Sequence, residues 1–191
     1  DQKPIDVLCY VQLEEDRPFT RWRIEVRNET EYAIRAVEYP TVHAVFQLGE
    51  SAYDDRILVP KHDGHLLGNP KLCIWEADGE PKDHQRYFYP GEGKQFPGGI
   101  SAQLLAYYDK DGGLYIATHD GDGHPKKLGP VWVSNECGDI LDFTPVHCNP
   151  EIVGENYTSP YDTVIGCFQG DWQDAADIYK EWAIQQSWCG R

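Results

Sequence analysis

The feature that most constrains the fold of this sequence is a series of short segments in which apolar and polar residues alternate. The clearest is RWRIEVR, residues 21–27, where Trp22, Ile24 and Val26 alternate with charged side chains. A period of two predicts a β-strand with one buried and one solvated face. VLCYVQL, AIRAVEY and VHAVFQL are similar segments, bounded by turn-forming residues. This rhythm is typical of an antiparallel sandwich and not of alternating strands and helices.

The second half of the chain repeats this pattern after a stretch rich in glycine and proline. Residues 49–100 predict loops around short strands such as RILV (56–59) and LCIW (72–75). SAQLLAYY, DKDGG and LYIATH then predict a β-hairpin over 101–119, because Asp and Gly provide the positive-φ positions of a tight turn. GPVWVS, ILDFTPVH and TVIGCF predict further strands. The sequence therefore indicates an all-β fold up to about residue 168.

The last segment, residues 169–191, predicts an amphipathic helix. Asp171 stands at the expected N-cap, and Asp174 adds negative charge to the first turn, where the helix dipole favours it. The apolar residues recur at the spacing of one helix face and are Trp172, Ala175, Ala176, Tyr179, Trp182 and Ala183. This face either packs onto the sandwich or belongs to the first helix of a further domain; the heavy aromatic content favours the second alternative.

Composition excludes several classes of function. The 191 residues carry a net charge of −15, which argues against nucleic acid and against an anionic membrane surface as partners. No run of about eighteen apolar residues is present, so no membrane-spanning segment is predicted. The six cysteines include no CxxC pair; three lie in the apolar runs VLCYV, KLCIW and VIGCF, where buried thiols are expected. Three disulfide bonds also remain possible, and the sequence does not decide which cysteines would pair.

Polar clusters give no metal or cofactor site. His62, Asp63 and His65 are metal-ligand types, but a site needs three or four ligands in fixed geometry, and a solvated turn is the simpler interpretation. DKDGG and HDGDGH resemble calcium loops, yet Leu114 and Pro125 occupy the positions where an EF-hand requires glycine. No Walker loop, dinucleotide fingerprint or GxSxG motif is present. The sequence therefore predicts no metal ion, no cofactor and no catalytic residue.

The loop THDGDGHPKK, residues 118–127, is the best candidate for a binding site. It places several hydrogen-bonding side chains beside strands rich in aromatic residues. Sugar hydroxyls need directional hydrogen bonds together with an apolar face for stacking, so this combination suits a carbohydrate. An ordinary solvated loop is the alternative.

Three segments resemble a known family: DDRILVPKHDGHLLGNP, QLLAYYDKDGGLYIATHDGDGHPKKL and SPYDTVIGCFQGDWQDAADIYKEWAIQQSWC. They resemble the N-terminal region of large bacterial glycoside hydrolases in which a mutarotase-like β-supersandwich precedes a TIM-barrel catalytic domain. These enzymes are distantly similar to the endo-α-N-acetylgalactosaminidases. The resemblance covers roughly residues 40–190, and residues 1–40 match only in strand character.

The resemblance implies a β-sandwich domain over 1–168 and a C-terminal helix over 169–191 that leads into a TIM barrel. It places the catalytic carboxylates in that barrel, so none is assigned here. His119, Asp120 and Lys126 are the expected ligand-facing residues, and carbohydrate and the barrel are the expected partners. The expected function is a non-catalytic domain of a glycoside hydrolase, with a secreted or periplasmic location favoured over a cytoplasmic one.

Two alternatives remain open. A stand-alone carbohydrate-binding module would need an exposed platform of coplanar rings. A mutarotase-type epimerase would need a positioned acid and base, for which His119 or His147 are the candidates.

Overall fold

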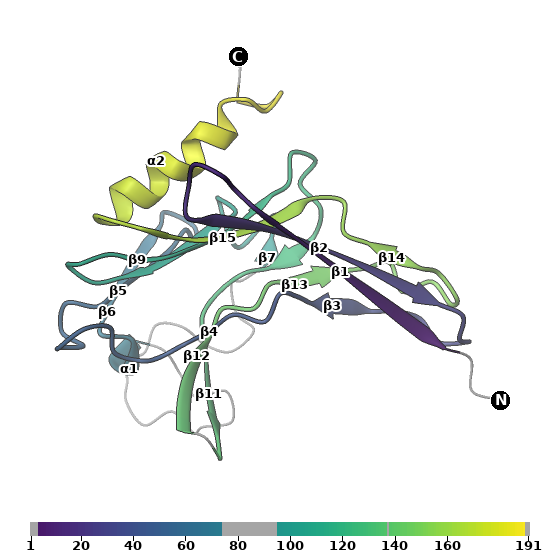
Figure 1. Ribbon diagram of the computed structural model, residues 1–191, viewed down its shortest axis with the longest axis horizontal. Coiled ribbons are helices and arrows are strands. Elements are labelled where there is room, and N and C mark those ends of the chain that lie inside the picture. The colour runs from purple at the N-terminus through teal and green to yellow at the C-terminus, as the bar shows by residue number, and fades with distance from the viewer. Residues whose placement is uncertain (1–3, 74–94, 137, 190–191) are drawn as a thin grey trace.

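The computed structural model describes residues 4–73, 95–136 and 138–189 and shows an antiparallel β-sandwich with one long helix near its C-terminal end (Figure 1). The large sheet has the order β1-β2-β15-β9-β8-β5-β6, with β14 also paired to β2. Its strands are β1 (Ile5–Leu13), β2 (Phe19–Asn28), β5 (Arg56–Val59), β6 (His65–Gly68), β8 (Leu104–Tyr108), β9 (Gly113–His119), β14 (Tyr157–Thr158) and β15 (Asp162–Phe168).

Two smaller sheets complete the sandwich. One has the order β3-β13-β10-β7, with β3 (Ala36–Glu38), β7 (Gln95–Phe96), β10 (Lys126–Lys127) and β13 (Val146–Cys148). The other has the order β11-β12-β4, with β4 (His43–Ala44), β11 (Val131–Asn135) and β12 (Gly138–Asp142). The helices are α1 (Pro70–Cys73) and α2 (Trp172–Ala183). The smaller sheets lie against one face of the large sheet and α2 against the other (Figure 1).

The predicted hairpin and most of the predicted strands are confirmed, although only His43–Ala44 of VHAVFQL forms a strand. Ile24 and Val26 of β2 are buried, while Arg23 and Arg27, which flank them, are exposed. Strands β8 and β9 form the predicted hairpin in a register that pairs Tyr108 with Gly113. The Asp109 carboxylate accepts hydrogen bonds from two backbone N–H groups of the turn, which fixes its shape.

Strand β8 is buried on both faces. Leu105 and Tyr107 pack into the core between the sheets, together with Ile116, Leu141 and other apolar residues. The alternate residues Leu104, Ala106 and Tyr108 pack into a second core under α2. Side chains alternate between the faces of a strand, so a strand covered on both sides must be apolar throughout, as LLAYY is.

Helix α2 packs onto the large sheet, which is the first of the two alternatives considered for its apolar face. The Asp171 side chain accepts from the Gln173 N–H, and the Asp174 carboxylate accepts from the Asp171 N–H, so the predicted N-cap is confirmed as a capping box. Ala175 and Ala183 are buried, and Ile178 and Tyr179 join the second core. No helix among the described residues is long and apolar enough to cross a membrane.

Two local predictions are wrong. Leu72 and Cys73 of the predicted strand LCIW belong to α1, because Pro70 at the first helical position favours a helix start there; Ile74 and Trp75 lie outside the described residues. Cys9 and Cys167 are exposed, although both lie in apolar runs. Apolar neighbours in the sequence therefore do not ensure that a thiol is buried.

Gly166 of β15 allows two aromatic rings to meet across the large sheet. It pairs with Phe19 of β2 on one side and with Tyr115 of β9 on the other. The two rings contact each other edge to face, with centroids 5.6 Å apart. A Cβ atom at position 166 would overlap the Phe19 ring and the Pro18 carbonyl oxygen.

We therefore expect Gly166→Ala to lower the free energy of unfolding by about 1–3 kcal/mol, as overpacking of a tight core does. Chemical denaturation measures this change. Gly68→Ala is the matched control, because a Cβ there would lie 3.4 Å from its nearest neighbour, a flexible Arg56 atom. Equal effects of the two substitutions would contradict the role of Gly166.

Candidate functional site

The loop between β9 and β10 is organised by the carboxylate of Asp120. Its Oδ1 accepts hydrogen bonds from the backbone N–H groups of Asp122 and Gly123, each at 3.1 Å. Its Oδ2 accepts from the His124 N–H at 2.6 Å, and the His124 ring lies 2.9 Å from Oδ1. The carboxylate thus satisfies the backbone donors of a tight turn, which is the usual role of Asp in such loops. The calcium-like spacing of the loop follows from this turn.

Lys126 forms a buried ion pair beneath the loop. Its ammonium donates hydrogen bonds to Asp120 Oδ2 and, at 2.8 Å, to Gln103 Oε1. The side chain of Lys126 is fully buried, and that of Asp120 is 2% exposed. The ammonium also lies over the rings of Phe96 (4.8 Å) and Tyr161 (4.4 Å), which compensates part of its lost hydration.

Gln103 connects this ion pair to the large sheet. Its Nε2 donates to the Asp120 carbonyl oxygen at 2.8 Å, and its Oε1 accepts from the Thr118 hydroxyl at 3.0 Å. Burial raises the pKa of Asp120, but the hydrogen bonds from Lys126 and His124 oppose this, and the net pKa of the carboxyl is lowered. Asp120 is therefore ionised at neutral pH, with its oxygens occupied by donors.

His147 extends the buried polar network toward β13. Its Nε2 lies 2.6 Å from the Tyr39 carbonyl oxygen, which can only accept, so Nε2 carries the proton. Burial lowers the pKa of His147, and in the neutral ring Nδ1 accepts from the Tyr161 hydroxyl at 2.6 Å. Both ring nitrogens are thus engaged within the protein.

A cavity of about 260 Å³ opens above Gln103 and Asp120, and we name it the Trp188 cavity. It is lined by loop residues 120–123 and by Phe96, Ser101, Gln103, Tyr179 and Trp188. The Trp188 indole N–H donates to the Gly121 carbonyl oxygen at 3.0 Å, which holds the exposed ring at the rim. The cavity therefore combines aromatic side chains with the polar groups of a tight turn.

Trp188 packs against an aromatic ring of α2. It meets Trp182 at an interplanar angle of 64°, and Trp182 meets Tyr179 at 52°. Trp182 itself does not line the cavity. Neither of these two ring pairs is coplanar, whereas a surface-binding module would need a platform of coplanar rings.

His119 faces a different part of the molecule from Asp120. Its ring stacks on Trp182 of α2, with centroids 4.7 Å apart and an interplanar angle of 11°. Neither ring nitrogen has a hydrogen-bond partner among the described residues, and both are buried. Burial, assisted by the nearby Arg21, lowers the pKa of His119 to about 4. The imidazole is therefore neutral at physiological pH.

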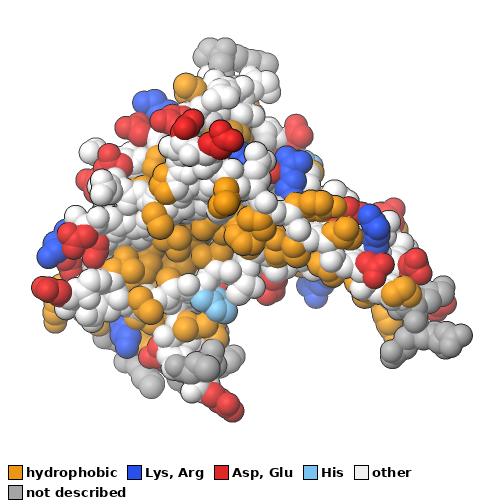
Figure 2. Space-filling view, viewed as in Figure 1, with side chains coloured by type: hydrophobic (Ala, Val, Ile, Leu, Met, Phe, Trp, Pro, Cys, Tyr) orange, Lys and Arg blue, Asp and Glu red, His pale blue; other side chains and the backbone are white. Residues whose placement is uncertain are grey.

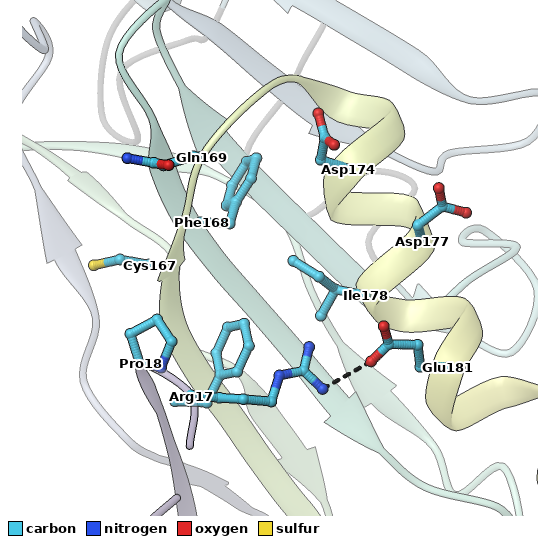
Figure 3. A pocket seen from close by; sticks show the side chains of 10 residues that line it. Arg17, Pro18, Cys167, Phe168, Gln169, Asp174, Asp177, Ile178 and Glu181 are labelled. Atoms are coloured by element: carbon cyan, nitrogen blue, oxygen red, sulfur yellow. Dashed lines mark hydrogen bonds and ion pairs between the residues drawn. The ribbon is translucent and has the colours of Figure 1, made fainter. Parts of the chain in front are cut away.

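A larger hollow, about 640 Å³, lies between α2, β15 and the turn that joins β1 to β2 (Figure 3). Phe168 and Ile178 point into it, and Arg17 spans one side through an ion pair with Glu181 of 2.8 Å (Figure 3). Both partners of that pair are exposed, so it contributes little stability. The hollow is open and its charged groups are solvated, which distinguishes it from the Trp188 cavity.

The three predicted ligand-facing residues have three different placements. Asp120 lines the Trp188 cavity, Lys126 lies buried beneath it, and His119 lies under α2. Their role in ligand binding stays a prediction. Sequence reasoning missed Gln103, Tyr179 and Trp188, which reach the cavity from distant segments; the only available signal was the aromatic content of residues 169–191.

A comparison with protein families gives a match at the end of the chain. The sequence model of a family described as a domain of unknown function (DUF6259) matches residues 157–191. This stretch contains β14, β15 and α2 and includes Tyr161, Tyr179 and Trp188. No curated protein matches the chain significantly.

Proposed function

We propose that this chain is a non-catalytic sandwich domain of a glycoside hydrolase and that it binds carbohydrate in the Trp188 cavity. The observation that carries the proposal is the composition of this cavity. Tyr179 and Trp188 contribute aromatic side chains to its lining, and the tight turn contributes the exposed side chain of Asp122. Sugars are bound by this combination of stacking and directional hydrogen bonds.

A non-catalytic role agrees with the state of the candidate acids and bases. The Asp120 carboxylate is ion-paired and saturated with donors, so its pKa is low and it is a poor general acid. His147 uses both ring nitrogens internally. His119 is desolvated beneath Trp182. The epimerase alternative therefore gains no support from these three residues.

The TIM-barrel partner rests on the family resemblance of residues 159–189. The DUF6259 match covers nearly the same stretch and adds no function of its own. Helix α2 presents Asp174, Asp177, Lys180 and Glu181 on its exposed side, so this surface is available to a neighbouring domain. In the proposed role, the sandwich positions α2 and thereby the start of the barrel.

Binding of carbohydrate is tested with a panel of neutral oligosaccharides and the Trp188→Ala variant. We expect a member of the panel to quench tryptophan fluorescence of the unmodified chain, and Trp188→Ala to weaken binding by at least about tenfold, since exposed Trp side chains often dominate binding energy. Trp172→Ala is the matched control. Trp172, the first residue of α2, is exposed as Trp188 is, but it does not line the cavity.

Three results would overturn the proposal. Absence of binding across the panel, or equal affinity of Trp188→Ala and the unmodified chain, would remove the carbohydrate site. Hydrolysis of aryl glycosides by the purified 191-residue chain would show that the domain is catalytic.

A further inference from the structure

Strand β1 is an open edge of the large sheet. It pairs with β2 on one side, and no strand in the described part of the chain pairs with its other side. β1, β2 and β14 form an arm that extends away from α2 (Figure 1). β1 is nine residues long and contains neither proline nor lysine, the residues that commonly protect such edges. An edge of this kind is a template for another strand.

The odd-numbered residues of β1 direct their backbone groups toward this open edge. The Glu14 N–H donates to the Phe19 carbonyl oxygen, and the Glu29 N–H donates to the Pro4 carbonyl oxygen. Both contacts continue the register of β1 and β2. Hydrogen-bonded pairs alternate along an antiparallel ladder, so the even-numbered residues of β1 bond to β2. The N–H and C=O groups of the odd-numbered residues therefore point toward the open edge, where no described strand pairs with them.

The same odd-numbered residues form an exposed apolar face. They are Ile5, Val7, Cys9, Val11 and Leu13, and all are exposed, with Leu13 at 74%. Their cross-strand partners on β2 include the buried residues Ile24 and Val26, so this face continues one of the core clusters of the sandwich. Figure 2 shows hydrophobic side chains gathered along this arm. Exposed apolar faces of this kind mark interaction surfaces.

We propose that β1 pairs in antiparallel orientation with β1 of a second copy of this chain, about a two-fold axis at Cys9. This register places Ile5 opposite Leu13, Val7 opposite Val11 and Cys9 opposite Cys9. Each odd-numbered residue then pairs with another odd-numbered residue, so all N–H and C=O groups that point toward the open edge are used. The apolar faces of the two copies become continuous across the interface.

The side chains of β1 cause no charge repulsion with a second copy in this register. The chain as a whole carries a net charge of −15, which opposes association of two copies in general. β1, however, has Asp6 as its only charged side chain, and the two-fold axis places Asp6 opposite Gln12 of the other copy. No like charges meet along the paired strands. Pairing about Cys9 also aligns the full length of both strands, which other registers do not.

The oligomeric state tests this interface, with two pairs of substitutions as opposing variants. Light scattering at increasing concentration should give a mass of twice 21.8 kDa for the unmodified chain. The double variant Val7→Lys with Val11→Lys places a lysine of one copy opposite a lysine of the other, so it should give the monomer mass. Val7→Glu with Val11→Lys opposes Glu with Lys and should retain the dimer. Both positions are exposed, so the fold tolerates either pair.

Cysteine cross-linking tests the register. Hydrogen-bonded antiparallel pairs have Cα atoms about 5.5 Å apart, within the range of a disulfide. Mild oxidation should therefore link Cys9 to Cys9 in preference to Cys167, which is also exposed and reports random collision. A monomer at all concentrations would overturn the proposal. So would loss of the dimer in the Glu–Lys variant, or cross-linking of Cys9 no faster than Cys167.

Discussion

Lys126→Met is expected to lower the free energy of unfolding by about 3–5 kcal/mol, the usual cost of leaving one partner of a buried ion pair unpaired. The substitution keeps most of the side-chain volume but removes the ammonium that neutralises Asp120. Gln103 Oε1 loses a donor as well. Because the lowered pKa of Asp120 depends on this ammonium, the ionised carboxylate becomes a buried, uncompensated charge. Urea unfolding at neutral pH measures the change.

Two further variants define the origin of this effect. Lys180→Met removes a lysine whose ion pair with Asp177 is exposed, and it should change stability by less than about 0.5 kcal/mol. Adding Asp120→Asn to Lys126→Met should recover part of the lost stability, because an amide oxygen still accepts from the loop and carries no charge. If Lys126→Met and Lys180→Met had similar effects, Asp120 would not be a charged group of the core.

Acid should destabilise this protein through His119, by about 3 kcal/mol between pH 7 and pH 4. The pKa of His119 is about 4 in the folded state and 6.5 when the side chain is solvated. Between these values the unfolded chain binds a proton that the folded protein excludes. The contribution of His119 is therefore complete above pH 6.5 and is lost as the pH falls toward 4. Denaturation at a series of pH values measures it.

His119→Phe isolates this contribution from that of other titrating groups. Phenylalanine keeps a ring stacked on Trp182 and removes two buried nitrogens that have no partner among the described residues. The variant should equal the unmodified chain in stability at neutral pH or exceed it, and exceed it by about 2 kcal/mol at pH 5. In Trp182→Ala, the pKa of His119 measured by NMR should rise toward 6.5. Parallel pH profiles of His119→Phe and the unmodified chain would contradict this account.

The elements that the sequence predicts correctly are those whose determinants lie close together in the chain. The alternation in RWRIEVR specifies β2, and Asp109 with its glycines specifies the turn between β8 and β9. Asp171 and Asp174 specify the start of α2. In each case a repeat period or a few neighbouring residues contain the physical cause. The wrong prediction of a strand at LCIW also has a local cause. Pro70, just before this segment, favours a helix more strongly than the apolar residues of the segment favour a strand.

The candidate site could be predicted only in part. The loop 118–127 was identified because its polar residues are consecutive. The sequence did not show that the side chains of this loop lie in different parts of the protein. His119 is the last residue of β9 and Asp120 follows it, so their side chains turn to opposite faces. Similarly, Lys126 is buried while its neighbour Lys127 is exposed. Which lysine enters the core depends on where β10 lies relative to Phe96 and Tyr161.

The sequence by itself thus determines the strands, the hairpin and the cap of α2, since these depend on local periodicity and on short-range hydrogen bonds. Tertiary structure alone decides which polar residues are paired inside the protein and which face a ligand. Gln103 and Tyr179 are 76 residues apart and still share a hydrogen bond at the Trp188 cavity. The exposure of the apolar face of β1 also depends on its neighbours in the sheet. Burial is a property of the whole packed chain, which no local pattern contains.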